Sequence, residues 1–196
     1  MVPLVSLIRY NVSSFCLTIA QSGLYEPSGG MLRGSSRLLQ DYNLKAYENI
    51  IKIISNNDLV WNIDIDKYST ENIIVLINCY NDIKLELEKL GIKSHVILIT
   101  KIMLGILGNV PAYDQYFSKG FSNISLDLSK SNSFYAFNES SLKLLSEFYL
   151  VYKEVIDSKA EKIKIIDFSG KTTKMHYPKA KIIDMIGFKR GEEISK

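Results

Sequence analysis

The feature that most constrains this chain is the recurrence of apolar residues every three or four positions. In the clearest case the pattern runs from residue 73 to residue 90, with Ser69 before it and Gly91 after it. A serine can cap the first turn of a helix, and a glycine can adopt the left-handed conformation that ends one. Because this spacing puts the apolar side chains on one face, the segment is predicted to be a helix packed against a core.

Other stretches with the same spacing each predict a helix. They lie at 3–21, 38–54, 94–107, 111–121, 142–155 and 178–188. Residues 59–66 alternate apolar and polar side chains, as a short strand does, and residues 160–177 have the pattern of a β-hairpin around Ser169 and Gly170. We therefore expect one mainly α domain over residues 1–196, a bundle-like array of about six to seven helices with a small C-terminal β-hairpin.

The composition is that of an ordinary globular protein. Of the 196 residues, 46% are hydrophobic and 23% are charged, which suits a single domain with a core. Isoleucine and lysine are abundant whereas arginine is rare, a bias expected of AT-rich codons and hence of a low-GC bacterium. Lysines are concentrated in the final quarter of the chain. The net charge of +3 is too small to imply a polyanion partner by itself, so a solvated surface is the simplest interpretation.

Three features indicate a soluble, cytoplasmic protein with no membrane partner. The apolar start of the chain has no basic region before it and is interrupted by Arg9, unlike a signal peptide. The apolar stretch 96–110 contains Lys101 and is shorter than the roughly 20 residues needed to span a bilayer. Cys16 and Cys79 lie in apolar-periodic stretches, where a thiol usually behaves as a small buried hydrophobe rather than a disulfide partner.

Several motifs that would define an enzyme class are missing from the sequence. The only histidines are His95 and His176, and they have no cysteine spacing of a zinc site near them. The phosphate-binding P-loop, the dinucleotide-binding glycine fingerprint, the GxSxG nucleophile elbow and the protein-kinase signatures are also missing. We expect no metal and no cofactor, and whether the chain is an enzyme stays open.

The strongest local candidate for a ligand site is a glycine-rich segment, GGMLRGSSR at 29–37, just before a predicted helix. Glycines let backbone amides approach a ligand, a helix N-terminus favours an anion, and arginine can bind phosphate or carboxylate through two bonds. The alternative is a structural turn in which Arg33 bonds to carbonyls or to Glu26. The predicted ligand-binding residues are Glu26, Gly30, Arg33, Ser35, Ser36, Arg37 and, from a second loop, Tyr113.

The second candidate is Lys101, which lies in an apolar helix ahead of Asp114. Burial in a helical bundle favours a neutral, nucleophilic amine, and Asp114 could then accept its proton. Alternatively, Lys101 extends to water while Asp114 is stabilised by the dipole of a helix that begins at Pro111. Lys101 and Asp114 are the candidate catalytic residues.

The segment TKIMLGILGNVPAYDQYF resembles the lysine-then-aspartate segment of helix-hairpin-helix DNA glycosylases. In that family a helical lysine is followed by a loop, an apolar–proline pair and an aspartate. The resemblance covers fewer than twenty residues, the glycine-rich hairpin that grips DNA phosphate is missing before Lys101, and the interval to Asp114 is shorter. It implies base-excision chemistry at Lys101 and Asp114.

These observations leave three hypotheses for the function. In the first, the glycine–arginine–serine loop and the turn at Tyr113 and Asp114 form one site for an anionic ligand, a nucleotide or nucleic acid. In the second, the chain is a noncatalytic interaction module of a mobile element or defence locus, and it binds a protein partner through an exposed apolar patch. In the third, it is a DNA-processing enzyme of the glycosylase or lyase type that uses Lys101 and Asp114.

Overall fold

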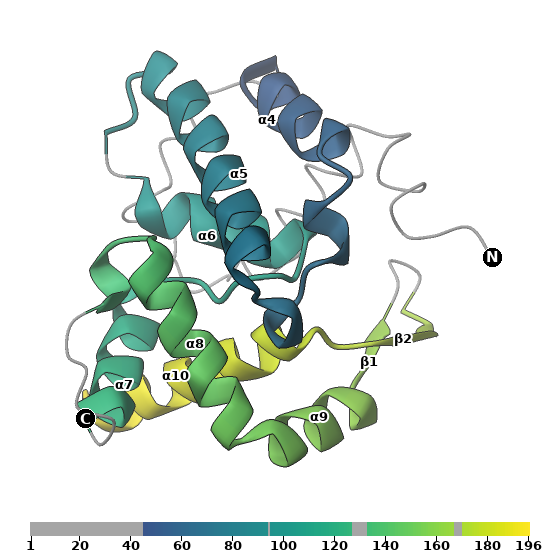
Figure 1. Ribbon diagram of the computed structural model, residues 1–196, viewed down its shortest axis with the longest axis vertical. Helices are drawn as coiled ribbons and strands as arrows, with labels where there is room; N and C mark the ends of the chain where they lie inside the picture. Colours follow the sequence, from purple (N-terminus) through teal and green to yellow (C-terminus); the bar gives the residue numbers. More distant parts are fainter. Residues whose placement is uncertain (1–44, 94, 127–132, 167–169) are drawn as a thin grey trace.

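The computed structural model describes residues 45–93, 95–126, 133–166 and 170–196. Within these ranges the chain forms seven α-helices and a two-stranded antiparallel hairpin, so the prediction of a mainly α fold with a C-terminal hairpin is confirmed (Figure 1). The helices are α4 (Lys45–Asn56), α5 (Thr70–Lys89), α6 (Val96–Ile106), α7 (Gln115–Leu126), α8 (Glu139–Val151), α9 (Lys153–Lys162) and α10 (Lys179–Glu193). Three short 3₁₀ helices, η2 (Val60–Asn62), η3 (Ile65–Lys67) and η4 (Ser133–Tyr135), lie in the connections.

Helix α5 forms as its sequence predicts. The Ser69 side chain accepts a hydrogen bond from the Asn72 backbone at 3.2 Å, and Gly91 adopts a φ of 78° just after the helix ends. One face of α5 is buried through Ile73, Leu76, Cys79, Tyr80, Ile83 and Leu87. This face packs on α4, α6 and α8, and the shared apolar interior is the core of the molecule.

Helices α7 and α10 form the closest helix pair among the described elements. Gly120 on α7 lies against Gly187 and Gly191 on α10, where no side chain separates the two backbones. An aromatic cluster extends from this contact into the core, and its buried members are Tyr113, Phe117, Phe121, Phe134, Phe137 and Phe148.

Several predicted boundaries are wrong. Residues 59–66 form η2 and η3 instead of a strand, because no neighbouring segment among the described residues offers a strand to pair with and the local turns satisfy the backbone. The helix expected at 111–121 begins at Gln115 and reaches Leu126. The helix expected at 142–155 is two helices, and the chain bends at Tyr152.

The C-terminal hairpin consists of β1 (Lys164–Ile166) and β2 (Thr172–His176). Lys164 pairs with His176 and Ile166 pairs with Thr172, with an irregularity between them. Figure 1 shows the hairpin at the edge of the helices, between α9 and the start of α10. The last helix is longer than predicted and ends at Glu193. The helix predicted at 3–21 and the start of the one predicted at 38–54 fall outside the described residues.

Within the described residues, the helices are all too short or too polar to cross a membrane.

Candidate functional site

The loop at 108–114 connects α6 to α7 and is held by contacts from distant parts of the chain. Gly108 adopts a φ of 65°, and a Cβ atom there would lie 3.0 Å from Pro178 Cβ and closer still to Pro178 Cγ. Only glycine combines this conformation with such a close approach. Asn109 is fully buried, its side-chain amide donates to the Val60 carbonyl at 3.2 Å, and its own carbonyl accepts from the Tyr68 hydroxyl.

Two side chains bind the backbone of the same loop where it has no strand or helix partner. The Ala112 amide donates to Asp184 Oδ1 on α10 at 2.9 Å, and the Tyr113 amide donates to Thr100 Oγ1 on α6 at 3.0 Å. A buried backbone amide without a partner would cost stability, so these two bonds fix the path of the loop. The loop thereby gains a defined conformation outside regular secondary structure.

Asp114 ends this loop and begins α7. Its Oδ1 atom accepts from the Phe117 amide at 2.9 Å, which is the bond of an N-cap residue. Its Oδ2 atom lies 3.9 Å from Lys101 Nζ, which comes from α6. The side chains of Lys101 and Asp114 retain exposed fractions of 15% and 18%, so the pair is largely enclosed but still reaches solvent.

The two candidate catalytic residues are therefore neighbours, although 13 positions separate them in the sequence. The loop from Gly108 turns the chain back so that the start of α7 meets the middle of α6. At 3.9 Å the contact is an ion pair at its outer limit and too long for a direct hydrogen bond. Lys101 Nζ is thus held near a carboxylate without being locked onto it.

A second carboxylate lies close to this pair. Asp184 binds Lys181 Nζ through its Oδ2 atom at 3.0 Å, and its other oxygen holds the Ala112 amide. Burial raises the pKa of Asp184, whereas Lys181 and the amide lower it, and the charge of Asp114 raises it further. The site therefore combines two lysines and two aspartates around the same loop, and their formal charges balance.

Tyr113, predicted as a ligand-binding residue, is buried in the aromatic cluster. Its hydroxyl donates to Ser141 Oγ at 3.0 Å, and its ring stacks on Phe117 at a centroid distance of 5.8 Å. Burial raises the pKa of its hydroxyl. The Tyr113 side chain thus holds the loop against the aromatic cluster of the core.

Cys79 and the two histidines are less suited to catalysis than the Lys101–Asp114 pair. Cys79 is fully buried, and burial raises the pKa of its thiol to about 12, so the thiol stays protonated and unreactive near neutral pH. His95 contacts Glu88 Oε1 at 3.3 Å through Nε2 and packs edge-on against Tyr80. His176 is exposed on β2. Within the described residues, no group of three or more His, Cys, Asp and Glu side chains could hold a metal ion.

The glycine-rich candidate site lies outside the described residues. Glu26, Gly30, Arg33, Ser35, Ser36 and Arg37 all belong to it. Its relation to Asp114 therefore stays a prediction.

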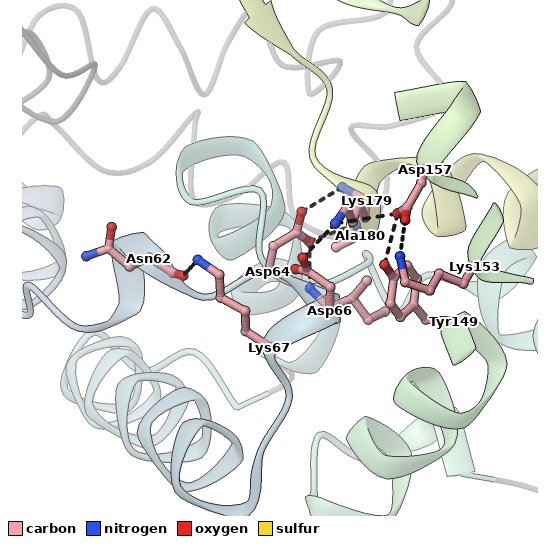
Figure 2. A network of polar contacts seen from close by, with 10 residues as sticks. Asn62, Asp64, Asp66, Lys67, Tyr149, Lys153, Asp157, Lys179 and Ala180 are labelled. Carbon is pink, nitrogen blue, oxygen red and sulfur yellow. Dashed lines mark hydrogen bonds and ion pairs between the residues drawn. The ribbon is translucent and has the colours of Figure 1, made fainter. Parts of the chain in front are cut away.

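A second polar centre was missed by sequence reasoning (Figure 2). Asp64 receives hydrogen bonds from the backbone amides of Lys179 at 2.8 Å and Ala180 at 3.0 Å, and so caps α10 from 115 positions away. Pro178, which precedes that helix, has no side chain able to cap it. Burial raises the pKa of Asp64, and the three amides that it binds, including that of Ile65, lower it.

The same centre anchors α9 to η3 and α10. Lys179 Nζ lies 2.6 Å from Asp66 Oδ2 and 3.4 Å from Asp157 Oδ1 (Figure 2). Tyr149 donates to Asp157 at 2.9 Å, and Lys153 binds the other oxygen of that carboxylate. Every one of these groups is paired, so the centre is explained by its structural role. The unpaired cap at Pro178 was the signal in the sequence that a remote acceptor was needed.

The interaction-module hypothesis predicted an exposed apolar patch. Leu150, Val151, Tyr152 and Val155, at the junction of α8 and α9, have exposed fractions between 46% and 66%. Isolated exposed apolar side chains are normal on a protein surface, whereas a run of them is less common. The partner that would cover this run stays a prediction.

Comparison with known proteins identifies no relative. No protein-family model, curated protein or solved structure matches the chain. A proposed function must therefore rest on the residues of the site.

Proposed function

We propose that this protein processes nucleic acid, with Lys101 as an amine nucleophile and Asp114 as the group that accepts its proton. The observation that supports this most directly is the 3.9 Å approach of Lys101 Nζ to Asp114 Oδ2, in a site that keeps limited contact with solvent. A nucleophile beside a base, with the base oriented by a third group, is the arrangement that covalent catalysis needs, and the 3.9 Å separation has to shorten for proton transfer. Here the α7 amide of Phe117 orients Asp114.

The proposed reaction is the cleavage of an abasic nucleotide. The Lys101 ammonium gives a proton to Asp114, and the free amine attacks the C1′ aldehyde of the opened sugar. A carbon–nitrogen bond forms, the carbonyl oxygen takes up one proton from the attacking nitrogen and one from Asp114, and it leaves as water. The product is an iminium ion on Lys101.

The second half of the reaction breaks the strand. A carboxylate removes a proton from C2′, the electron pair of that bond forms a carbon–carbon double bond, and the 3′-phosphate leaves with its bonding electrons. Water then hydrolyses the iminium ion and returns the free amine. We assign the first proton transfer to Asp114, which faces Lys101, and Asp184 on α10 is close enough to interact with the charge of Asp114. General acid–base catalysis of this kind contributes about 10²- to 10⁴-fold in rate.

The test is borohydride trapping of the full-length protein on a duplex that contains one abasic site. Borohydride reduces the iminium ion to a stable amine, so a reactive lysine becomes covalently attached to DNA. We expect a trapped complex with the natural protein and none with Lys101→Gln. Lys93→Gln is the matched control, because Lys93 is exposed in the loop before α6, whereas Lys101 is largely enclosed beside Asp114.

Asp114→Asn separates the chemical role of Asp114 from its structural one. An asparagine oxygen can still accept from the Phe117 amide and cap α7, but it cannot take up the proton of the ammonium. We expect a folded variant in which trapping is slower by about 10²-fold or more. The absence of trapping by the natural protein, or equal trapping by folded Lys101→Gln, would refute the proposal.

A further inference from the structure

We infer that the last turn of α9 and the β-hairpin form a surface that binds the phosphate backbone of duplex nucleic acid. This basic surface consists of Lys159, Lys162, Lys164, Lys171 and Lys174. The segment 159–177 contains five lysines and only two carboxylates, Glu161 and Asp167. The formal surplus of three equals the net charge of the whole chain, so all other residues together are balanced.

Four of the five lysines of this surface have no ion-pair partner among the described residues. Lys159, Lys162, Lys164 and Lys174 are exposed, and none of them has a carboxylate partner within the part of the chain that the structure describes. Ion pairs do hold the other lysines of the last quarter, which are Lys153, Lys179, Lys181, Lys189 and Lys196. The ammonium groups of these four exposed lysines are therefore available to an external anion.

The register of the hairpin brings two of its basic residues together. Lys164 lies opposite His176, and opposed residues share a face of the ribbon. Lys174 lies on the same strand as His176, two positions before it. Lys159 and Lys162 continue the surface from the last turn of α9, which contacts β2.

Duplex nucleic acid fits this surface better than a membrane does. A two-stranded ribbon is one of the elements that the major groove of DNA admits, and its lysines then reach the phosphates on either side. A membrane-binding surface needs a broad apolar face beside its cations. Among the described side chains of 159–177, Met175 is the only large hydrophobic one that is exposed. The choice of nucleic acid as the polyanion rests on the function proposed above.

The test is a fluorescence-anisotropy titration of a labelled duplex of about 20 base pairs with the full-length protein, over about 50 to 200 mM salt. Each lysine that neutralises a phosphate contributes about 0.9 to the slope of log affinity against log salt. Lys164→Gln with Lys174→Gln should therefore lower that slope by about two and weaken binding near 0.1 M salt by roughly 50-fold. Lys159→Gln with Lys162→Gln should act in the same direction.

The matched control is Lys52→Gln with Lys93→Gln, which removes the same charge from two exposed lysines away from the hairpin. Any of three results would overturn the inference. The control could weaken binding equally, both double variants of the basic surface could keep their affinity, or the protein could bind anionic vesicles but not the duplex. Anisotropy measures binding and borohydride trapping measures chemistry, so the two proposals are tested separately. If the natural protein binds the duplex but is not trapped on abasic DNA, the proposed catalytic pair is refuted and the basic surface is not. If it is trapped but the two variants of the basic surface keep its salt dependence, the basic surface is refuted and the catalytic pair is not.

Discussion

The contact between α7 and α10 makes Gly120→Ala strongly destabilising. A Cβ atom on Gly120 would lie 2.5 Å from the Gly191 amide nitrogen and closer still to the Gly187 carbonyl oxygen. Ordinary contacts are about 3.5 Å or longer, so α10 would have to move away by about 1 Å. The obstacle is backbone on both sides, and no side-chain rotation can relieve it.

The loss in free energy of unfolding comes from the contacts that this movement would loosen. The Phe117 ring lies so close to Gly187 that a Cβ there would be 2.5 Å from Phe117 Cδ2, and a gap of about 1 Å would forfeit up to half of the dispersion energy along this contact. Overpacking costs about 1 to 3 kcal/mol, and the loosened aromatic contacts add to it. The better helix propensity of alanine returns about 1 kcal/mol. We expect a net loss of about 3 kcal/mol in the free energy of unfolding, or roughly 6 to 12 °C in Tm.

Urea denaturation followed by circular dichroism measures this loss. Gly91→Ala is the control, because nothing lies within 4 Å of the added Cβ and only the positive φ of 78° is strained. That variant should lose about 1 kcal/mol. If Gly120→Ala is as stable as the natural protein or more stable, then α7 and α10 leave room for a Cβ atom and this reasoning is refuted.

Two further variants probe the polar contacts of α10. Asp64→Ala removes the acceptor for the amides of Lys179 and Ala180 and should lower the free energy of unfolding by about 2 to 3 kcal/mol in urea denaturation, with a smaller loss for Asp64→Asn. Burial raises the pKa of Asp184, so the folded state binds this proton more tightly than the unfolded state does. The associated stability is fully present below the ordinary carboxyl pKa of about 4 and is lost as pH rises through the raised value. The free energy of unfolding of the natural protein, relative to that of Asp184→Asn, should therefore fall over that pH window. Urea denaturation at a series of pH values measures this difference. A difference that stays constant or rises with pH would contradict the prediction.

Local signals in the sequence predict much of the helical fold. Ser69 and Gly91 mark the ends of α5 because a cap and a left-handed glycine act within one turn of the helix. The hairpin is predicted for the same reason, since Gly170 adopts a φ of 80° in its turn. The strand at 59–66 fails because strand formation depends on a partner elsewhere in the chain, and alternation alone carries no information about that partner.

The candidate site could be predicted only in part. The spacing of Lys101 and Asp114 suggested a pair, and the structure brings them to 3.9 Å. Pro111 misled the prediction of where α7 begins, because the amides after it bind Asp184 and Thr100 in place of helical partners. Asp184 is 72 positions from Ala112, and no local pattern links them.

The geometry of the Lys101–Asp114 pair depends on the last helix of the chain. Asp184 fixes Ala112, two residues before Asp114, and Pro178 at the start of α10 lies against Gly108 at the other end of the loop. Asp64 in turn caps the first turn of α10, so the residue just before η3 supports the helix that holds the loop. The position of Asp114 therefore depends on α10. The separation of Lys101 and Asp114 is a property of the whole fold, and a change at Asp64 should act on the proposed chemistry of Lys101 as well as on stability, because each step from Asp64 to Asp114 is a direct contact.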